Sequence, residues 1–317
     1  MSDYIKITCA EKDALLAQEF RFEFPVQYTE YNRLSQQDLY EKVCDQDVII
    51  ISDLTIDEKV LKNNPNLKLI ALCSTGFDHI DLEQLKSRNI KICNIRGYAG
   101  DAVAEHAFLL MMNLIKNFST QLNAVNKGSW SKGQASFYLA APMYELKGKT
   151  LVILGKGEIG LALAKKADAF GMKVIFSERK NATSCRQGYI DFDDAIQQAD
   201  ILSLHCEFNK QTIEIINYDV LKRIKKGCIL INVGRGGLLN NQDVVNALEQ
   251  KLLGGLGIDV LDIEPPPKNH PLLQLEHLNV MVTAHIAWAT NEAQQRLFNI
   301  LEDNINSNIL GSEKNLL

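Results

Sequence analysis

Three side chains that could do chemistry follow apolar, strand-like stretches in the second half of the chain: Arg235, Glu264 and His285. A guanidinium can hold a carboxylate through two parallel hydrogen bonds and polarise the neighbouring carbonyl group. An imidazole can give or take a proton near neutral pH. A carboxylate beside the imidazole fixes its tautomer and raises its pKa. Together, these residue types suit hydride transfer between a cofactor and a 2-keto acid.

Each of the three residues also has an ordinary structural interpretation. Arg235 lies in a glycine-rich loop, where many arginines are solvated, and Glu264 precedes three prolines. His285 follows a strand, where histidines often cap or pack. Open parallel sheets, however, bind ligands at the carboxyl ends of their strands. The order of the three residues behind a nucleotide-binding motif therefore favours the chemical interpretation.

That motif is a glycine-rich turn between an apolar stretch, residues 151–154, and a helical pattern. Its glycines are Gly155, Gly157 and Gly160. In such a turn the first glycine allows the tight bend, the second lets the backbone approach a pyrophosphate, and the third lets the helix pack on the strand. The N–H groups of the first helical turn, at Glu158, Ile159 and Gly160, then form an anion site.

A second apolar stretch, residues 173–177, leads to Glu178. This is about 20 residues beyond the first glycine, where an acid would hydrogen-bond the adenosine ribose of NAD. A carboxylate there also repels a 2′-phosphate, so we expect NAD to be preferred over NADP. Arg179 and Lys180 act in the opposite direction, because cations can neutralise a phosphate.

Strand-like and helix-like stretches alternate along the chain, which predicts α/β units with parallel sheets. Before the glycine motif we expect strands at residues 4–9, 47–51, 68–73 and 90–93, and a helix at 82–88. After it we expect strands at residues 201–204, 228–233, 256–260 and 280–283, and a last helix at 291–310. An apolar helix is expected from about Asp101 to Phe118. Because it is apolar nearly all round, we expect it to be buried, and a second subunit is one surface that could bury it.

Composition excludes several classes of protein. The chain has 317 residues, enough for two domains, with 46% hydrophobic and 23% charged residues and a net charge of −5. The negative net charge predicts no nucleic-acid partner. No apolar run in the sequence reaches membrane-spanning length, so we expect no membrane span. The start of the chain lacks the features of a signal peptide, which favours the cytoplasm. The cysteines and histidines show no metal-binding spacing, so we expect reduced thiols and no metal site.

With these motifs in this order, the sequence resembles the D-isomer-specific 2-hydroxyacid dehydrogenases over essentially its whole length. The resemblance rests on the glycine motif and on residues 232–236, 259–265 and 285–290. Residues 176–180 and the stretch that begins at His285 are most similar to the branch of glycerate dehydrogenases and hydroxypyruvate reductases.

The resemblance implies a Rossmann-type doubly wound domain that binds NAD, residues 99–285. It also implies a smaller flavodoxin-like α/β substrate domain, made of residues 1–98 and 286–317. The helix that starts near Asp101 matches the dimerisation element of the family, which implies a homodimer.

The resemblance also assigns roles to residues. The catalytic residues would be Arg235, Glu264 and His285. The substrate would be bound by Ser74, Thr75, Gly76, Arg235 and His285. The cofactor would be lined by His205, Val233, Gly234, Arg235 and Asp259, in addition to the glycine motif and Glu178.

The sequence departs from the family pattern at three places. Ala99 and Gly100 stand where many members have Gly-Thr, which removes a hydroxyl near the cofactor. Arg96 and Ala284 each replace a common proline. No departure removes one of the three catalytic side chains.

The expected activity is NAD-dependent interconversion of a small 2-keto acid, such as hydroxypyruvate or glyoxylate, and its D-2-hydroxy acid. A nucleotide-sensing protein of the same fold, similar to a transcriptional corepressor in the family, is the alternative from another class. Formate oxidation is disfavoured, because that branch has a glutamine where this chain has Glu264.

Overall fold

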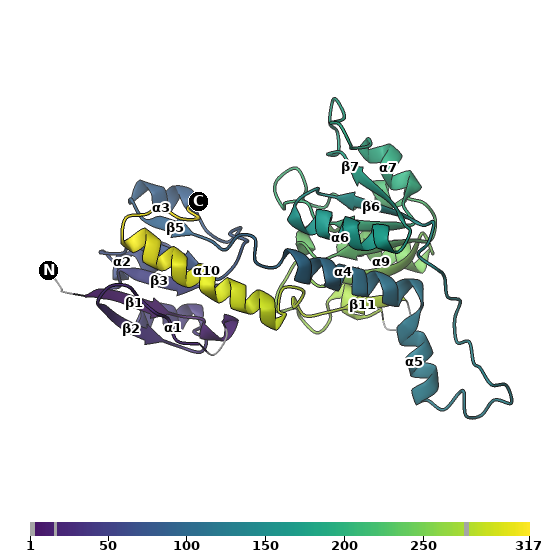
Figure 1. Cartoon of the computed structure of the whole chain (residues 1–317), viewed down its shortest axis with the longest axis horizontal. Coiled ribbons are helices and arrows are strands. Elements are labelled where there is room, and N and C mark those ends of the chain that lie inside the picture. The colour runs from purple at the N-terminus through teal and green to yellow at the C-terminus, as the bar shows by residue number, and fades with distance from the viewer. Residues whose placement is uncertain (1–3, 16–17, 276–278) are drawn as a thin grey trace. The chain divides into compact units, whose positions relative to one another are not determined.

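The computed structural model describes residues 4–15, 18–275 and 279–317, and it divides the chain into two units (Figure 1). One unit is Met1–Tyr98 with Ala289–Leu317, and the other is Ala99–Trp288. The sequence places this last boundary after His285, slightly earlier in the chain. Ile286 and Ala287 stay with the second unit because their backbone N–H groups donate to the Asp259 carboxylate at 2.9 and 2.8 Å.

The first unit is built around a five-stranded parallel sheet in the order β2-β1-β3-β4-β5. The strands are β1 (Ile5–Cys9), β2 (Val26–Glu30), β3 (Val48–Ile51), β4 (Leu69–Leu72) and β5 (Lys91–Cys93). This 2-1-3-4-5 order is that of flavodoxin-like folds. Every side chain of β3 and β4 is buried, as expected of central strands in a sheet that is covered on both faces.

The sequence pattern gives no indication of β2. Its side chains are partly or fully exposed along the whole strand, because β2 lies at the edge of the sheet and lacks a buried apolar run. The helices of this unit are α1 (Gln36–Lys42), α2 (Glu58–Asn63), α3 (Leu82–Ser87) and α10 (Asn291–Ile309). Each begins after a polar residue whose side chain accepts a backbone N–H of the first turn: Ser35, Asp57, Asp81 and Thr290.

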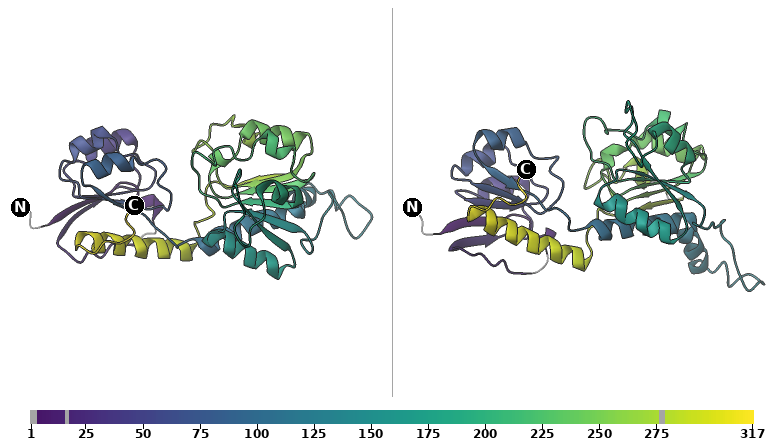
Figure 2. Two further views of the ribbon diagram at one scale, coloured as in Figure 1. Left: turned by 90° about the horizontal axis from the view of Figure 1, so that it is seen from above. Right: turned by 45° about the horizontal axis from the view of Figure 1, so that its top comes forward.

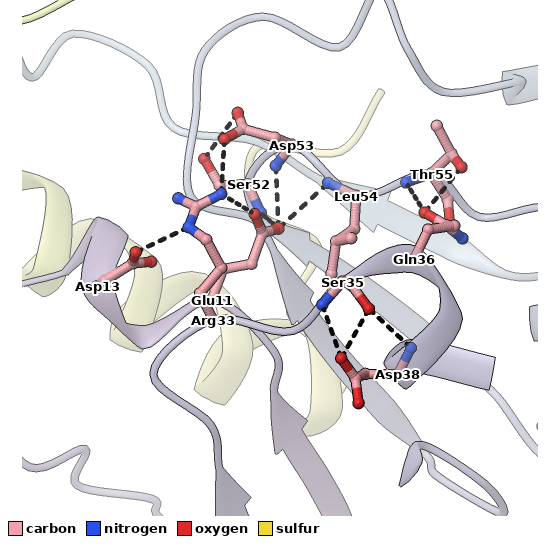
Figure 3. Close-up of polar contacts among 10 residues, drawn as sticks. All are labelled: Glu11, Asp13, Arg33, Ser35, Gln36, Asp38, Ser52, Asp53, Leu54 and Thr55. Carbon is pink, nitrogen blue, oxygen red and sulfur yellow. Dashed lines mark hydrogen bonds and ion pairs between the residues drawn. The ribbon is translucent and has the colours of Figure 1, made fainter. Parts of the chain in front are cut away.

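Just beyond β1, the buried side chain of Glu11 fixes the loop that follows β3 (Figure 3). One carboxylate oxygen accepts the backbone N–H groups of Ser52, Asp53 and Leu54 at 2.6, 3.0 and 3.2 Å. The other accepts Nη1 of Arg33 at 3.0 Å. A buried carboxylate is tolerated only when it is paired and hydrogen-bonded, so these contacts together make Glu11 an anchor for the carboxyl ends of two strands.

The second unit contains a six-stranded parallel sheet in the order β11-β10-β9-β8-β6-β7. The strands are β6 (Thr150–Leu154), β7 (Lys173–Ser177), β8 (Ile201–Leu204), β9 (Cys228–Asn232), β10 (Leu253–Ile258) and β11 (Val280–Val282). The chain moves from β6 to β7 on one side and then returns to place β8 on the other side of β6. Such a reversal creates the crevice where doubly wound sheets bind ligands, and the glycine turn follows β6.

Helices cover both faces of this second sheet (Figures 1 and 2). The helices of this unit are α4 (Gly100–Ile115), α5 (Phe118–Asn126), α6 (Glu158–Ala169), α7 (Phe192–Gln198), α8 (Tyr218–Leu221) and α9 (Asn241–Glu249), and α5 is the one that extends away from the sheet. The helix expected from Asp101 to Phe118 is broken, because Asn117 adopts a left-handed backbone with φ of 46°. The break separates the buried α4 from α5, which has no buried side chain.

None of the helices within the described ranges combines the length and hydrophobicity that are needed to cross a membrane.

Candidate active site

The glycine turn after β6 is built by close backbone packing. Gly155 has a φ of 102°, and a Cβ on it would lie 2.3 Å from the carbonyl oxygen of His205. A Cβ on Gly160 would lie 2.2 Å from the carbonyl oxygen of Gly155. Both positions therefore require glycine, the first because of its conformation and contact and the second because α6 sits directly on the turn.

The same turn has room for a phosphate group. A Cβ on Gly157 would meet no heavy atom within 4 Å, so open space lies over the start of α6. No side chain caps this helix, and its first turn consists of Glu158, Ile159 and Gly160. Uncapped N–H groups at a helix start bind anions, so the turn fits the pyrophosphate of a dinucleotide cofactor.

At the tip of β7, Glu178 lies under another side chain instead of facing solvent. Its carboxylate is 3% exposed, and Oε1 lies 2.6 Å from Nη2 of Arg186, which is 52% exposed. Nε of Arg186 also donates to Oε2 at 2.8 Å, and the backbone N–H groups of Arg179 and Arg186 donate at 2.8 and 3.0 Å. The side-chain bond with Arg186 is the main reason that the pKa of Glu178 falls to about 2.

Arg235 follows β9 in a turn that Asn232 holds together. The buried Asn232 side chain accepts the N–H of Gly234 at 3.1 Å and donates to the carbonyl oxygen of Arg235 at 2.9 Å. A Cβ on Gly236 would lie 1.9 Å from the carbonyl carbon of Leu261. The Arg235 turn and the loop after β10 are thus pressed together at the backbone, and only glycine allows this contact.

His285 and Glu264 meet at this edge of the sheet. Nδ1 of His285 lies 2.7 Å from Oε2 of Glu264, and Oε1 of Glu264 accepts the N–H of Leu261 at 2.7 Å. The side chains of His285 and Glu264 are 44% and 34% exposed. The imidazole is therefore oriented by a carboxylate while it remains accessible to a substrate.

The charges around this pair shift both pKa values. The hydrogen bond with Glu264 raises the pKa of His285, against the lowering effects of desolvation and of the Arg235 charge. Desolvation raises the pKa of Glu264, but the hydrogen bonds from His285 and Leu261 outweigh it and hold that pKa below the usual value. Arg235 lowers the pKa of Glu264 as well, so the three predicted residues share one electrostatic environment.

Asp259 organises the backbone around His285. Its buried carboxylate accepts the Thr283 hydroxyl at 2.6 Å as well as the N–H groups of Ile286 and Ala287. The carbonyl oxygen of Asp259 accepts the N–H of His285 at 2.7 Å. These bonds hold His285 at a φ of 54°, which is unfavourable for a residue with a side chain. Such conformations cluster at functional sites.

His205, which follows β8, has a neutral ring. Desolvation lowers its pKa to about 4, and Nε2 lies 2.8 Å from the Ser203 hydroxyl. Because its backbone also contacts Gly155, His205 lies beside the glycine turn at the point where the chain reverses. An uncharged ring there can line a cofactor without binding an anion tightly.

In the first unit, the loop after β4 is held by side chains that no sequence motif singles out. Nδ2 of Asn94 donates to the carbonyl oxygen of Thr75 at 2.7 Å, and the Thr75 hydroxyl donates to the carbonyl oxygen of Ile95 at 2.7 Å. The Ser74 hydroxyl donates to the carbonyl oxygen of Gly76 at 2.7 Å. The predicted substrate loop, Ser74 to Gly76, therefore has a fixed backbone.

The support for Asn94 comes from the end of the chain. Nδ2 of the fully buried Asn304, on α10, donates to the carbonyl oxygen of Asn94 at 3.0 Å. Asn315 donates in turn to Oδ1 of Asn304 at 2.8 Å, and Arg96 donates to Oδ1 of Asn94 at 3.0 Å. The sequence indicates this support only through two polar residues, Asn94 and Asn304, that interrupt otherwise apolar stretches.

The second unit thus brings together the glycine motif with His205, and separately Arg235, Glu264 and His285. Val233 and Gly234 lie in the Arg235 turn, immediately after β9. Within the described residues there is no group of three or more histidine, cysteine, aspartate or glutamate side chains that could hold a metal ion.

Comparison with known proteins decides the family. The family described as "D-isomer specific 2-hydroxyacid dehydrogenase, NAD binding domain" matches residues 108–287. The chain is 34% identical to the glycerate dehydrogenase of Methylorubrum extorquens over 98% of both sequences. It is 33% identical to the glyoxylate reductase of Thermofilum pendens, over 86% of this chain and 80% of that protein. The chain belongs to the D-isomer specific 2-hydroxyacid dehydrogenase family.

A solved structure of the TT0316 protein from Thermus thermophilus has a similar fold. It is 27% identical, covers 99% of this chain and 100% of its own, and has a TM-score of 0.85. The match to this 2-hydroxyacid dehydrogenase family confirms an α/β enzyme with a nicotinamide cofactor that acts on 2-hydroxy or 2-keto acids. The family's NAD-binding domain lies within the second unit, and it contains Arg235, Glu264 and His285.

Proposed function

We propose that this enzyme interconverts a small 2-keto acid, of the hydroxypyruvate or glyoxylate type, and its D-2-hydroxy acid with NAD(H). The observation that carries the proposal is the 2.7 Å contact between His285 and Glu264, at the same sheet edge as Arg235. The named relatives, a glycerate dehydrogenase and a glyoxylate reductase, support acids with two or three carbon atoms.

In the proposed reaction, three residues of the second unit have separate roles. Arg235 binds the substrate carboxylate through two hydrogen bonds and polarises the neighbouring carbonyl group. His285 gives a proton to the carbonyl oxygen during reduction and takes it back during oxidation. Glu264 fixes the ring so that Nε2 faces the substrate, and it stabilises the imidazolium. The bound nicotinamide supplies or accepts the hydride.

The cofactor is held by residues of the second unit. Gly155, Gly157 and the N–H groups of Glu158, Ile159 and Gly160 would hold its pyrophosphate. The positions proposed to line the nicotinamide and its ribose are His205, Val233, Gly234, Arg235 and Asp259, and Glu178 marks the adenosine end. Asp259 has a further role, because its carboxylate already holds the backbone beside His285.

The first unit is proposed as the substrate-binding domain. Its loop of Ser74, Thr75 and Gly76 offers backbone N–H groups to the substrate carboxylate. The hydroxyls of Ser74 and Thr75 are engaged with backbone carbonyls, which stiffens the loop and leaves recognition to the main chain.

We further propose a homodimer that forms through α4, α5 and the segment that follows them. This region exposes many large apolar side chains: Leu109, Phe118, Leu122, Val125, Trp130, Phe137, Tyr138, Leu139, Met143 and Tyr144. Figure 1 shows α5 and the following segment extending away from the sheet of their own unit. A contiguous exposed apolar patch marks an interaction site. Sedimentation of the double variant Phe137→Ser/Leu139→Ser should give monomers if the proposal holds.

All seven cysteines are free, which fits a reducing compartment, and we propose that the enzyme acts in the cytoplasm.

The decisive experiment follows NADH oxidation with a panel of 2-keto acids, including hydroxypyruvate, glyoxylate and pyruvate. We expect rapid turnover with the smallest acids. Tight NADH binding without turnover of any acid would contradict the proposed reaction and would instead favour nucleotide sensing without catalysis.

A further inference from the structure

The adenosine end of the cofactor site presents a cation where the sequence suggests an anion. Oε1 of Glu178 accepts three hydrogen bonds, from the Arg179 N–H at 2.8 Å and from Nε and Nη2 of Arg186 at 3.1 and 2.6 Å. Oε2 accepts two more, from the N–H and Nε of Arg186 at 3.0 and 2.8 Å. The carboxylate is therefore saturated and almost completely covered.

The guanidinium that covers it remains half-exposed and well ordered by its neighbours. The Arg186 side chain is 52% exposed, and its central carbon lies 4.0 Å from the centroid of the Tyr189 ring. Stacking on a ring occupies one face of the guanidinium plane and leaves donors at its edge available. A ligand that approaches the tip of β7 thus meets the edge of Arg186 before it meets Glu178.

Other cations lie near Arg186. Residues 178–190 contain Arg179, Lys180 and Arg186 but a single acid, Glu178. Lys156, within the glycine turn, reaches across to this segment, because its Nζ lies 5.2 Å from the Tyr189 ring and 3.3 Å from where a Cβ of Gly188 would be.

The nearest acids that follow this segment are engaged elsewhere. The Asp191 side chain caps α7 by accepting the N–H groups of Asp193 and Asp194, and Asp193 pairs with Arg223. The positive charge at the tip of β7 is therefore only partly compensated.

In doubly wound sheets the adenosine ribose lies at the tip of the second strand, which here is β7. A free acid at that tip binds the 2′-hydroxyl and repels a 2′-phosphate, whereas an arginine accommodates the phosphate. Here the acid is neutralised by the arginine, so its charge no longer excludes a phosphate.

We propose that the tip of β7 carries a subsite for the 2′-phosphate of NADP(H), with Arg186 as the residue that determines specificity. The enzyme then accepts NADPH as well as NADH. This inference extends the proposed function, because it adds a second cofactor to the same reaction.

The test compares kcat/KM for NADPH and for NADH with one saturating keto acid. In the wild-type enzyme both cofactors should support turnover. Arg186→Gln removes the cation and leaves Glu178 charged, so the ratio of NADPH to NADH efficiency should fall about 10- to 100-fold, the loss expected for a hydrogen bond between charged groups. Glu178→Gln should raise the same ratio. The matched control is Arg88→Gln, an arginine of the first unit that pairs with Glu58, and it should leave the ratio unchanged.

A binding experiment separates this inference from the proposed reaction. Calorimetric titration of the wild-type protein should show tighter binding of adenosine 2′,5′-bisphosphate than of AMP, with the difference lost in Arg186→Gln. This result does not depend on turnover, so an enzyme that reduces no keto acid would overturn only the proposed function. Equal affinity for the two nucleotides, or a cofactor ratio that Arg186→Gln does not change, would overturn the 2′-phosphate subsite.

Discussion

Nδ1 of His285 lies 2.7 Å from Oε2 of Glu264. The bond places the Nδ1 proton against a carboxylate, so Nε2 is the ring nitrogen that remains for proton transfer. His285 reaches this position through a left-handed backbone conformation, with φ of 54°, that the carboxylate and the carbonyl oxygen of Asp259 maintain.

The first prediction concerns pH. Because the pKa of His285 is raised, the imidazolium that reduction requires persists to higher pH than for free histidine, and keto-acid reduction should fall as pH rises through the raised value. Oxidation of the hydroxy acid needs neutral imidazole and should increase over the same range. Glu264→Gln keeps a hydrogen bond but removes the charge, so the fall in reduction should move to lower pH. Initial rates in both directions between pH 5 and 9 give the profiles, a range chosen around the histidine pKa of about 6.5.

The pair should also make stability depend on pH. The contribution from His285 is fully present below the unfolded pKa and is lost as pH rises through its raised pKa. The contribution from Glu264 is present above its unfolded pKa and is lost as pH falls through its lowered pKa. The pH profile of reduction tests the pairing of Glu264 with His285 directly. If the Glu264→Gln enzyme folded normally and kept the wild-type profile of reduction, Glu264 could not be the partner of His285.

The second prediction concerns Arg235. Replacing it with alanine should lower kcat/KM for the keto acid by about 100-fold or more, because two charge-assisted hydrogen bonds to the substrate are lost. Arg235→Lys keeps the charge but not the paired geometry, and it should recover only part of the activity. NADH binding, measured by fluorescence titration, should stay largely intact. If Arg235→Ala kept near wild-type kcat/KM, the proposed role of Arg235 in substrate binding would be contradicted.

The third prediction concerns the contact between two loops. A Cβ at position 236 would lie 1.9 Å from the Leu261 carbonyl carbon, so Gly236→Ala must push the Arg235 turn away from the loop that carries Glu264. We expect a loss of about 1–3 kcal/mol of unfolding free energy and a fall in kcat. Gly234→Ala is the matched control for stability, because its Cβ would lie 3.5 Å from the nearest heavy atom, an ordinary contact. Equal unfolding curves for both variants would contradict a close backbone contact at Gly236.

The fourth prediction concerns Asn94. Asn94→Ala removes the donor to the Thr75 carbonyl oxygen and should loosen the substrate loop. The KM for the keto acid should rise by about tenfold, the value of one buried hydrogen bond, while the KM for NADH stays unchanged. Asn66→Ala, an exposed asparagine of the same unit that bonds Asp45, is the control. A parallel rise in both KM values would indicate general loosening of the fold instead.

The fifth prediction concerns the buried carboxylate of Glu11. Glu11→Ala leaves the backbone N–H groups of three loop residues without their acceptor, which should cost about 1–3 kcal/mol in unfolding free energy. Arg33 loses one acidic partner but keeps Asp13 and Asp53. Glu11→Gln keeps one acceptor oxygen and should cost less. Urea unfolding followed by circular dichroism measures both values. A Glu11→Ala protein as stable as the wild type would show that the loop after β3 finds other partners.

The sequence by itself determined the features that are local. Apolar runs predict β6, β8 and the other buried strands, because strands covered on both faces must be apolar along their whole length. The glycine spacing predicts the turn after β6, since backbone conformation and close packing there exclude side chains. The sequence also locates Arg235, Glu264 and His285, because each follows a strand that its apolar residues predict.

Only the tertiary structure decided the features that depend on contacts through space. The edge strand β2 has no buried run, and Asn117 breaks a helix that periodicity alone makes continuous. The largest difference concerns the charge at Glu178. Its position in the sequence predicts a free acid, but Arg186, in the loop between β7 and α7, pairs with its carboxylate and neutralises it. The charge that a ligand meets is set by which side chains fold over a residue, and distance along the chain does not encode that.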